Sequence, residues 1–377
     1  MKYFILSIIF IITSNSYSQS YKLNKSKRSP ERARKLYYSV SKFKEDYIEN
    51  ILTSFVKQTR PNRYVGTEGN KKAQKFILDY INNNVRKKNT SVKSIKFVPD
   101  IEYAKKMYQS DLDATKGKLT KSQLVKWERF TKEREAHLDK LKSTNGHNIV
   151  WEKKGIKKPN EVIVVGAHFD TAAYNKKKLE MIEGGVQPGA DNNASGVVAA
   201  LALIDILSEL ELEKTVRVVF FDFGELGFLG SYDYAKNLTL EKGIRVYSYV
   251  ELLMLGYDTK TLDKEEKLGN MKLYYSTPSS SLHNLEKSIA QSFYAASSEG
   301  TFRVTFQTHS KNFLNGDNVS FQKMEIPSVV YTQNWESDFN GNRIHSRADH
   351  VSSINIKTLH HSTTNIAMAI ASWALDL

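Results

Sequence analysis

Two near-continuous runs of apolar residues mark the middle of the chain. EVIVVGA at residues 161–167 and TVRVVFFDF at 215–223 lack the alternation of polar and apolar positions typical of a half-buried strand. Parallel strands that are covered on both faces show this pattern. Between them, ASGVVAALALIDILSEL at 194–210 is apolar nearly all round. We therefore expect a buried helix between two buried strands.

The flanking sequence continues an alternation of helices and strands. Helical spacing of apolar residues predicts helices over 41–57, 70–84, 231–238, 282–294 and 356–375. Short β-rich runs predict strands at 91–99, 148–155, 245–255, 272–277 and 327–332. Alternating elements with right-handed crossovers indicate the α/β class. We expect a doubly wound mixed, mostly parallel sheet with helices on both faces.

One stretch interrupts this pattern. Between residues 101 and 141 the chain is rich in Lys, Glu and Gln, and Thr120 with Gln123 forms a capping box. We interpret it as a helical insertion, a solvated hairpin packed on the edge of the domain, with a lid or a partner-binding arm as the alternative. No linker is visible, so residues 19–377 are expected to form a single domain.

The N-terminus has the features of a secretory signal. Lys2 precedes an apolar run from Phe4 to Ile12, and small residues follow at Ser16 and Ser18. We expect a signal peptide at 1–18, cleavage near Ser18, and a secreted or periplasmic protein without a stable membrane anchor. An uncleaved anchor is the alternative, which the shortness of the run disfavours.

Composition limits the chemistry and the partners. The 377 residues contain no cysteine, so there are no disulfides, and any zinc ligands must be His, Asp or Glu. The net charge of +14 is spread in short basic runs without interleaved aromatic residues. This pattern indicates a solvated surface rather than a nucleic-acid partner. The oligomeric state stays open.

Polar residues that can bind metal follow the buried runs. His168 and Glu225 come just after the two runs, and Asp191 precedes the apolar helix. Ligands bind at the carboxyl edge of such sheets, and these three are zinc-binding residue types. Asp170 is placed to accept the second ring N–H of His168 and fix its tautomer. Taken singly, however, His168 is as well explained by packing and Asp191 by helix capping.

Four motifs in order give a more specific signal. GAHFDT, PGADNNASG, GELGFLGS and RIHSRADH resemble the zinc exopeptidase family of bacterial leucyl aminopeptidases, glutamate carboxypeptidases and the transferrin receptor ectodomain, and more distantly the glutaminyl cyclases. The resemblance runs from about Asn62 to the C-terminus, without the insertion. It implies that His168 binds one zinc, that Asp191 bridges, and that Glu225 with His345 completes the other site.

The chain also departs from the family pattern. Gly224 stands where the resemblance implies a general-base glutamate, and Leu253 stands where it implies a ligand aspartate. Glu251, two residues earlier on the same strand face, is a poor substitute ligand at roughly 6–7 Å. A further family segment keeps only its aspartate, Asp317. A relocated base could be Asp222, Glu251 or Asp317.

These features lead to a main hypothesis and two alternatives. The main one is an exported zinc aminopeptidase-like exopeptidase that acts on peptides with a metal-activated water, with impaired or altered activity left open. It predicts one tight zinc at Asp191, Glu225 and His345, with two as the alternative. It also predicts that Gly224→Glu with Leu253→Asp raises turnover. The alternatives are an inactive binding module and a single-zinc glutaminyl cyclase.

Overall fold

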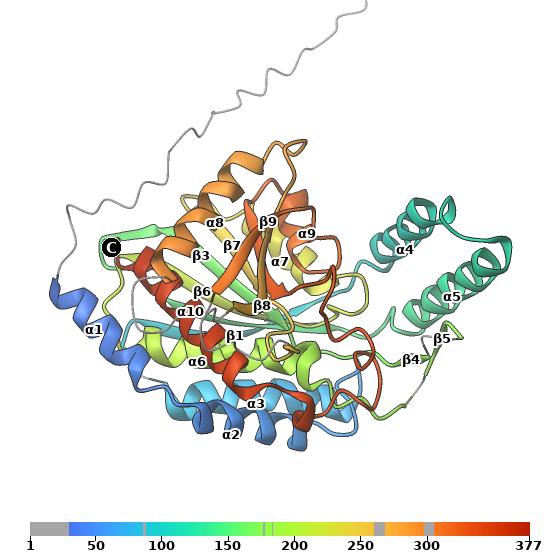
Figure 1. Ribbon diagram of the computed structural model, residues 1–377, viewed down its shortest axis with the longest axis horizontal. Coiled ribbons are helices and arrows are strands. Elements are labelled where there is room, and N and C mark those ends of the chain that lie inside the picture. The colour runs from blue at the N-terminus through green and yellow to red at the C-terminus, as the bar shows by residue number, and fades with distance from the viewer. Residues whose placement is uncertain (1–29, 86–87, 176–177, 183, 260–267, 298–304) are drawn as a thin grey trace, which may run out of the picture.

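The computed structural model describes residues 30–85, 88–175, 178–182, 184–259, 268–297 and 305–377. The expected signal peptide at 1–18 lies outside these residues. In the described ranges the strands and helices follow one another along the chain as the apolar pattern predicts (Figure 1).

An eight-stranded sheet forms the centre of the molecule, in the order β1-β2-β6-β3-β7-β10-β8-β9. Its strands are β1 (Thr90–Phe97), β2 (Gly146–Lys153), β3 (Lys158–His168), β6 (Lys214–Phe221), β7 (Arg245–Leu252), β8 (Leu268–Tyr275), β9 (Thr305–Ser310) and β10 (Ser328–Gln333). β6, β3, β7 and β10 are parallel neighbours, as are β8 and β9. β1, β2 and β8 pair antiparallel with β2, β6 and β10. The predicted mixed, mostly parallel sheet is confirmed.

The buried run of β3 shows why its sequence lacks alternation. Ile163, Val165 and Ala167 point into one hydrophobic cluster, while Val162 and Val164 point into another on the opposite face. Successive side chains of a strand alternate between faces, so a strand covered on both sides is apolar at every position.

Helices cover both faces of the sheet. The larger cluster takes its helical residues from α1 (Pro30–Ser41), α2 (Glu45–Gln58), α3 (Glu68–Asn84), α6 (Gly196–Ser208), α8 (His283–Ser297) and α10 (Ile356–Ala374). The opposite face packs against α7 (Leu229–Leu238) and α9 (Asn318–Lys323). The predicted burial of the Gly/Ala-rich helix is confirmed, since α6 is buried at almost every position.

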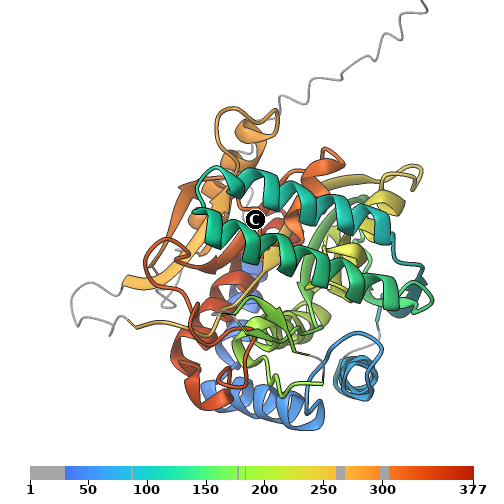
Figure 2. The same cartoon turned by 90° about the vertical axis from the view of Figure 1, so that its right-hand side faces the viewer.

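The charged insertion forms two helices, α4 (Ile101–Lys116) and α5 (Lys121–Lys140). The pair projects from the right-hand side of Figure 1 and runs across the front of Figure 2. The predicted capping box of Thr120 and Gln123 begins the second helix, α5. The hairpin packs on the domain through Ile101, Ala104, Tyr108 and Leu138.

Several short elements were not predicted. They are α1, β9, α9 and the small antiparallel pair β4 (Tyr174–Asn175) and β5 (Glu180–Met181). In the described residues one helical stretch, Ala190–Ser208, is long and apolar enough to cross a membrane, and 94% of it is buried inside the fold. It is therefore the core helix of the α/β domain.

Candidate functional site

The ends of parallel strands bring the candidate residues to one edge of the sheet. β3 ends at His168, which pairs in register with Phe221 at the end of β6. Glu225 follows β6 in the turn before α7, and the segment Ala190–Ser195 precedes α6. Loops after adjacent parallel strands meet at this edge, which is the ligand-binding edge of open α/β sheets.

Glu225 and His345 form a close pair at this edge. Glu225 Oε2 lies 2.9 Å from His345 Nε2, and both side chains are largely buried. Burial raises the pKa of Glu225, but His345, together with His168 and Asn192, lowers it by more, so the pKa of Glu225 lies below its usual value. Tyr174 packs on the His345 ring at 4.3 Å between centroids. The predicted proximity of these two residues is confirmed.

Asn192, rather than Asp191, completes this group. The Asn192 amide nitrogen lies 2.5 Å from Glu225 Oε1 and 3.1 Å from His345 Nε2. A bridging residue must reach the Glu225–His345 pair, and the side chain that does so is a neutral amide. The sequence interpretation assigned the bridging role to Asp191. The side chain that contacts the pair is that of the next residue, Asn192.

Asp191 points into a different network. Its carboxylate accepts hydrogen bonds from Gln333 Nε2 at 2.5 Å, Asn340 Nδ2 at 3.0 Å and the Gly256 amide at 2.9 Å. Burial, with the nearby Asp349 carboxylate, raises the pKa of Asp191. Because its oxygens already hold three loops together, we assign Asp191 a structural role instead of the expected bridging role.

His168 lines the same cleft as the Glu225–His345 pair and faces Asp170. Its Nδ1 is 3.5 Å from Asp170 Oδ1, an ion-pair distance but longer than a hydrogen bond. Burial lowers the pKa of His168. The carboxylates of Asp170, Glu225 and Asp317 outweigh this effect and raise the pKa of His168 to about 9. The carboxylate of Asp170 also accepts the backbone N–H groups of Gly224 and Glu225, at 2.8 and 3.1 Å. Asp170 therefore fixes the turn that carries Glu225.

Gly224 is packed against His168. A Cβ atom built on Gly224 would lie 2.4 Å from His168 Cβ and 2.7 Å from its Cγ. The space where the resemblance implies a general base is filled by the histidine. A glutamate cannot enter at this position unless His168 moves.

Two of the other base candidates, Glu251 and Asp222, are engaged in hydrogen bonds, whereas Asp317 is buried without one. Glu251 accepts the amides of Asp317 and Asn318 at the start of α9, at 3.0 and 2.9 Å. Burial and the Asp317 charge raise the pKa of Glu251 to about 8. Asp317 is fully buried, and its oxygens have no hydrogen-bond partner within the described chain. Asp222 accepts the Asn70 amide at 2.9 Å.

Leu253 belongs to a cluster of buried apolar side chains beside the site. It is 3% exposed and packs with Met254, Tyr274, Phe313, Val330 and Ile344. The position where the resemblance implies a ligand aspartate is thus surrounded by apolar side chains. A carboxylate there would be desolvated without a partner.

A buried arginine and a buried aspartate hold the site loops in place. Arg63 donates to the carbonyls of Phe169, Pro188 and Gly189, at 2.6, 2.6 and 2.9 Å. Asp349 accepts the amides of Asp191 and Asn192, at 2.9 and 3.0 Å. Neither role was predicted. Asp349 lies within the quoted RIHSRADH motif, but Arg63 stands in a loop that gave no functional signal.

A cleft of about 480 Å³ opens over the pair. An adjoining hollow of about 590 Å³ shares Tyr108, Asp111 and Arg134 with it, all from the α4–α5 hairpin. The remaining wall is largely apolar and aromatic, with Tyr174, Phe228, Leu314, Trp335 and Phe339. The insertion therefore packs on the domain, as expected, and also lines the cleft.

The residues of the cleft do not fit a catalytic zinc. Such an ion takes three protein ligands and a water. Glu225 and His345 provide two, and the third side chain that touches them is the Asn192 amide. In the described ranges, His168 and Asp191 do not join them in a group of three ligand atoms within 4.8 Å. The zinc set expected from sequence is therefore incomplete by one ligand.

Comparison with known proteins identifies the family. The model of peptidase family M28 matches residues 148–370, more than half of the 377 residues. The chain belongs to peptidase family M28. This M28 member is 32% identical to an aminopeptidase of Pseudomonas aeruginosa over 116 residues. The match covers 30% of the chain but only 19% of that relative.

Solved structures share the fold of the M28 member. A zinc aminopeptidase from Bacillus subtilis has a TM-score of 0.62 at 16% identity, over 89% of this chain and 98% of that one. A glutaminyl cyclase of Bacteroides thetaiotaomicron, bound to N-acetylhistamine, has a TM-score of 0.57 at 16% identity, over 87% and 98%. The predicted family and fold are thus confirmed, and the chain is an aminopeptidase-like member of a metallopeptidase family.

Proposed function

We propose that this M28 member binds peptides or peptide-like ligands in the cleft over Glu225 and His345, and that its peptide-bond hydrolysis is impaired. The observation that carries the proposal is the Asn192 amide, which contacts both residues of the pair. A neutral amide there leaves two ionisable ligands for a zinc that needs three. The names of relatives support zinc as the metal of the family.

The shape of the cleft supports a peptide ligand. Its aromatic and apolar wall suits side chains, while Asp111 and Arg134 offer one charge of each sign to the ends of a short peptide. Ligand sites usually combine an apolar lining with a few polar groups in this way.

Hydrolysis lacks its usual proton acceptor. A positioned general base contributes roughly 10²–10⁴-fold to rate. Gly224 offers no carboxylate, and the oxygens of Glu251 accept the backbone amides that begin α9. We therefore expect binding to survive better than turnover.

Binding and turnover should be measured on the same peptides. Calorimetry on a panel of di- to tetrapeptides should show binding that His345→Ala weakens, while mass spectrometry of the zinc-supplemented mixtures shows little cleavage. Rapid cleavage that His345→Ala abolishes would show a working exopeptidase instead. Loss of ammonia from peptides with an N-terminal glutamine would show the cyclase alternative.

We also propose that the protein is exported, on the basis of the apolar run from Phe4 to Ile12 and the small residues after it. N-terminal sequencing of the protein from its native cells should find a chain that begins near Gln19. Intact Met1 on a cytoplasmic form would contradict export.

A further inference from the structure

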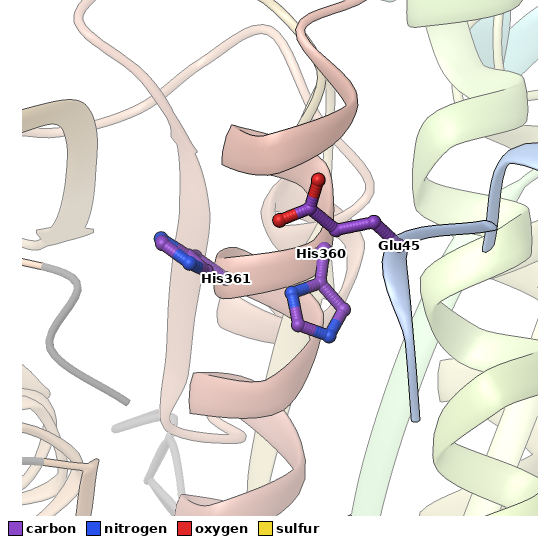
Figure 3. A group of neighbouring side chains, drawn as sticks. All are labelled: Glu45, His360 and His361. Carbon is purple, nitrogen blue, oxygen red and sulfur yellow. The ribbon is translucent and has the colours of Figure 1, made fainter. Parts of the chain in front are cut away.

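A second cluster of metal-binding side chains lies outside the cleft. Glu45, His360 and His361 each offer one ligand atom, and these atoms lie within 4.8 Å of one another. Figure 3 shows the Glu45 carboxylate at the start of α2 beside the two imidazoles of α10. None of the three lines the cleft over Glu225 and His345.

His360 is held in the tautomer that a metal requires. Its Nε2 lies 2.9 Å from the carbonyl oxygen of Phe43, which can only accept a hydrogen bond, so Nε2 carries the proton. The Nδ1 atom of the neutral ring then bears a lone pair. A backbone carbonyl on the other ring nitrogen is the usual support of a metal-bound histidine.

The same Nδ1 atom is an unpartnered polar group. His360 is 8% exposed, and its Nδ1 has no hydrogen-bond partner within the described chain. A buried nitrogen without a partner costs free energy unless a hydrogen-bond donor or a metal ion contacts its lone pair. The negative charge of Glu45 near the N-terminus of α2 also interacts favourably with the helix dipole. This interaction does not account for the unpartnered Nδ1 atom of His360.

We propose that Glu45, His360 and His361 form a second metal site that takes a divalent transition ion of the zinc class and fastens α10 to α2. Two imidazoles and one carboxylate match the ligand types that zinc accepts, and the exposed Glu45 leaves a side open for water. Ligand atoms bound to one tetrahedral ion lie closer together than 4.8 Å, so small side-chain movements complete the site.

The test titrates Zn²⁺ into full-length protein that carries His345→Ala, which removes a ligand of the cleft and separates this proposal from the proposed function. Competition with a chromophoric chelator should report one equivalent of bound zinc, and the melting temperature should rise with zinc. Co²⁺ should give the absorption of a four-coordinate ion.

Single ligand changes then locate the site. Glu45→Gln and His361→Ala should each weaken zinc binding about tenfold or more, since even the outer partners of metal ligands contribute 10–100-fold. His350→Ala, an exposed histidine outside the cluster, should leave the affinity unchanged. Absence of zinc binding by the His345→Ala protein would overturn the site, as would an affinity that Glu45→Gln and His361→Ala both leave intact. Glu45 is exposed, so Glu45→Gln keeps the test valid if the histidine variant fails to fold.

Discussion

Asn192, Gly224 and Leu253 decide what the cleft can do. An amide touches the Glu225–His345 pair, a glycine is packed on His168, and a leucine lies in an apolar cluster. The resemblance of the sequence to zinc exopeptidases implies a base at Gly224 and a ligand at Leu253, and a neutral amide contacts the pair at Asn192. The carboxylates of Asp191 and Glu251 are occupied by protein hydrogen bonds, so Asp317 is the base candidate that has no hydrogen-bond partner in the described chain.

Gly224→Glu should fail to restore a general base. Its Cβ would lie 2.4 Å from His168 Cβ, so the side chain forces His168 or the turn to move. Such overpacking typically costs about 1–3 kcal/mol. Urea unfolding should show this loss of stability, and peptide turnover should not rise. The expectation drawn from sequence was a gain in turnover from Gly224→Glu together with Leu253→Asp.

The control for this change is Gly117→Ala, where no atom lies within 4 Å of an added Cβ. It should leave the stability unchanged or slightly higher. A stable Gly224→Glu protein with faster turnover would mean that His168 yields easily and that the missing base alone limits activity.

The sequence predicted some of these residues and could not predict others. Glu225 and His345 stood in recognisable motifs, and the structure brings them together. The error of one position between Asp191 and Asn192 arose because the three residues 191–193 are all short and polar. Only the path of the backbone decides which side chain enters the cleft. The role of Arg63 could not be predicted, because its partners are three backbone carbonyls and these leave no pattern in the sequence.

At the scale of elements, α5 brings a cation to the cleft. The guanidinium carbon of Arg134 lies 4.0 Å from the centre of the Tyr108 ring, and its buried Nε has no hydrogen-bond partner in the described chain. Lys and Glu density predicted the two helices of the insertion. It could not show which face of the hairpin meets the domain, because the charged residues surround both helices.

Arg134→Gln should weaken the binding of peptides with a free C-terminal carboxylate by roughly tenfold or more, since a hydrogen bond to a charged group contributes about 1.5–3 kcal/mol. The loss should vanish for C-terminally amidated peptides. Lys132→Gln, an exposed cation on the same helix, serves as the control in calorimetry. Equal affinity of wild-type and Arg134→Gln proteins for free peptides would exclude this contact.

The helical layer contains a pH-sensitive contact. Asp205 of α6 accepts hydrogen bonds from Tyr47 of α2, at 2.9 Å, and from Tyr80 of α3. Burial raises the pKa of Asp205 to about 6, although both tyrosines lower it. The folded state thus holds this proton more tightly than the unfolded chain.

Stability from Asp205 should therefore fall as the pH rises from about 4 to about 6 and stay level above that. The rise in the pKa of Asp205 on folding corresponds to a change of at most about 3 kcal/mol in the free energy of unfolding. Asp205→Asn should remove this slope in urea unfolding measured between pH 4 and 7. A slope that the substitution leaves unchanged would assign the pH dependence to another group.

At the scale of the whole molecule, the α/β domain keeps the architecture of its family while the cleft lacks a complete ligand set. The pattern of apolar residues predicted the sheet because the apolar runs of β3 and β6 are buried on both faces, from Val162 to His168 and from Val218 to Phe221. Catalytic competence depends instead on distances of a few ångström between loops that are far apart in sequence. Those distances are set by the packing of the loops, which a linear pattern does not contain.

Turnover of the Asn192→Asp protein shows whether the neutral amide beside Glu225 and His345 is what limits hydrolysis. Asp has nearly the shape of Asn, so the substitution adds a third ionisable ligand beside Glu225 and His345 without a steric conflict. Asn315→Asp adds the same charge to an exposed position of the same cleft and is the matched control. The measurement is kcat/KM on aminoacyl amides with added zinc.

We expect slow hydrolysis by the wild-type and Asn315→Asp proteins. Asn192→Asp should hydrolyse the substrates at least about tenfold faster, because a complete ligand set would allow a metal-activated water. Wild-type turnover as fast as that of an ordinary family exopeptidase in the same assay, with no gain from Asn192→Asp, would contradict this expectation.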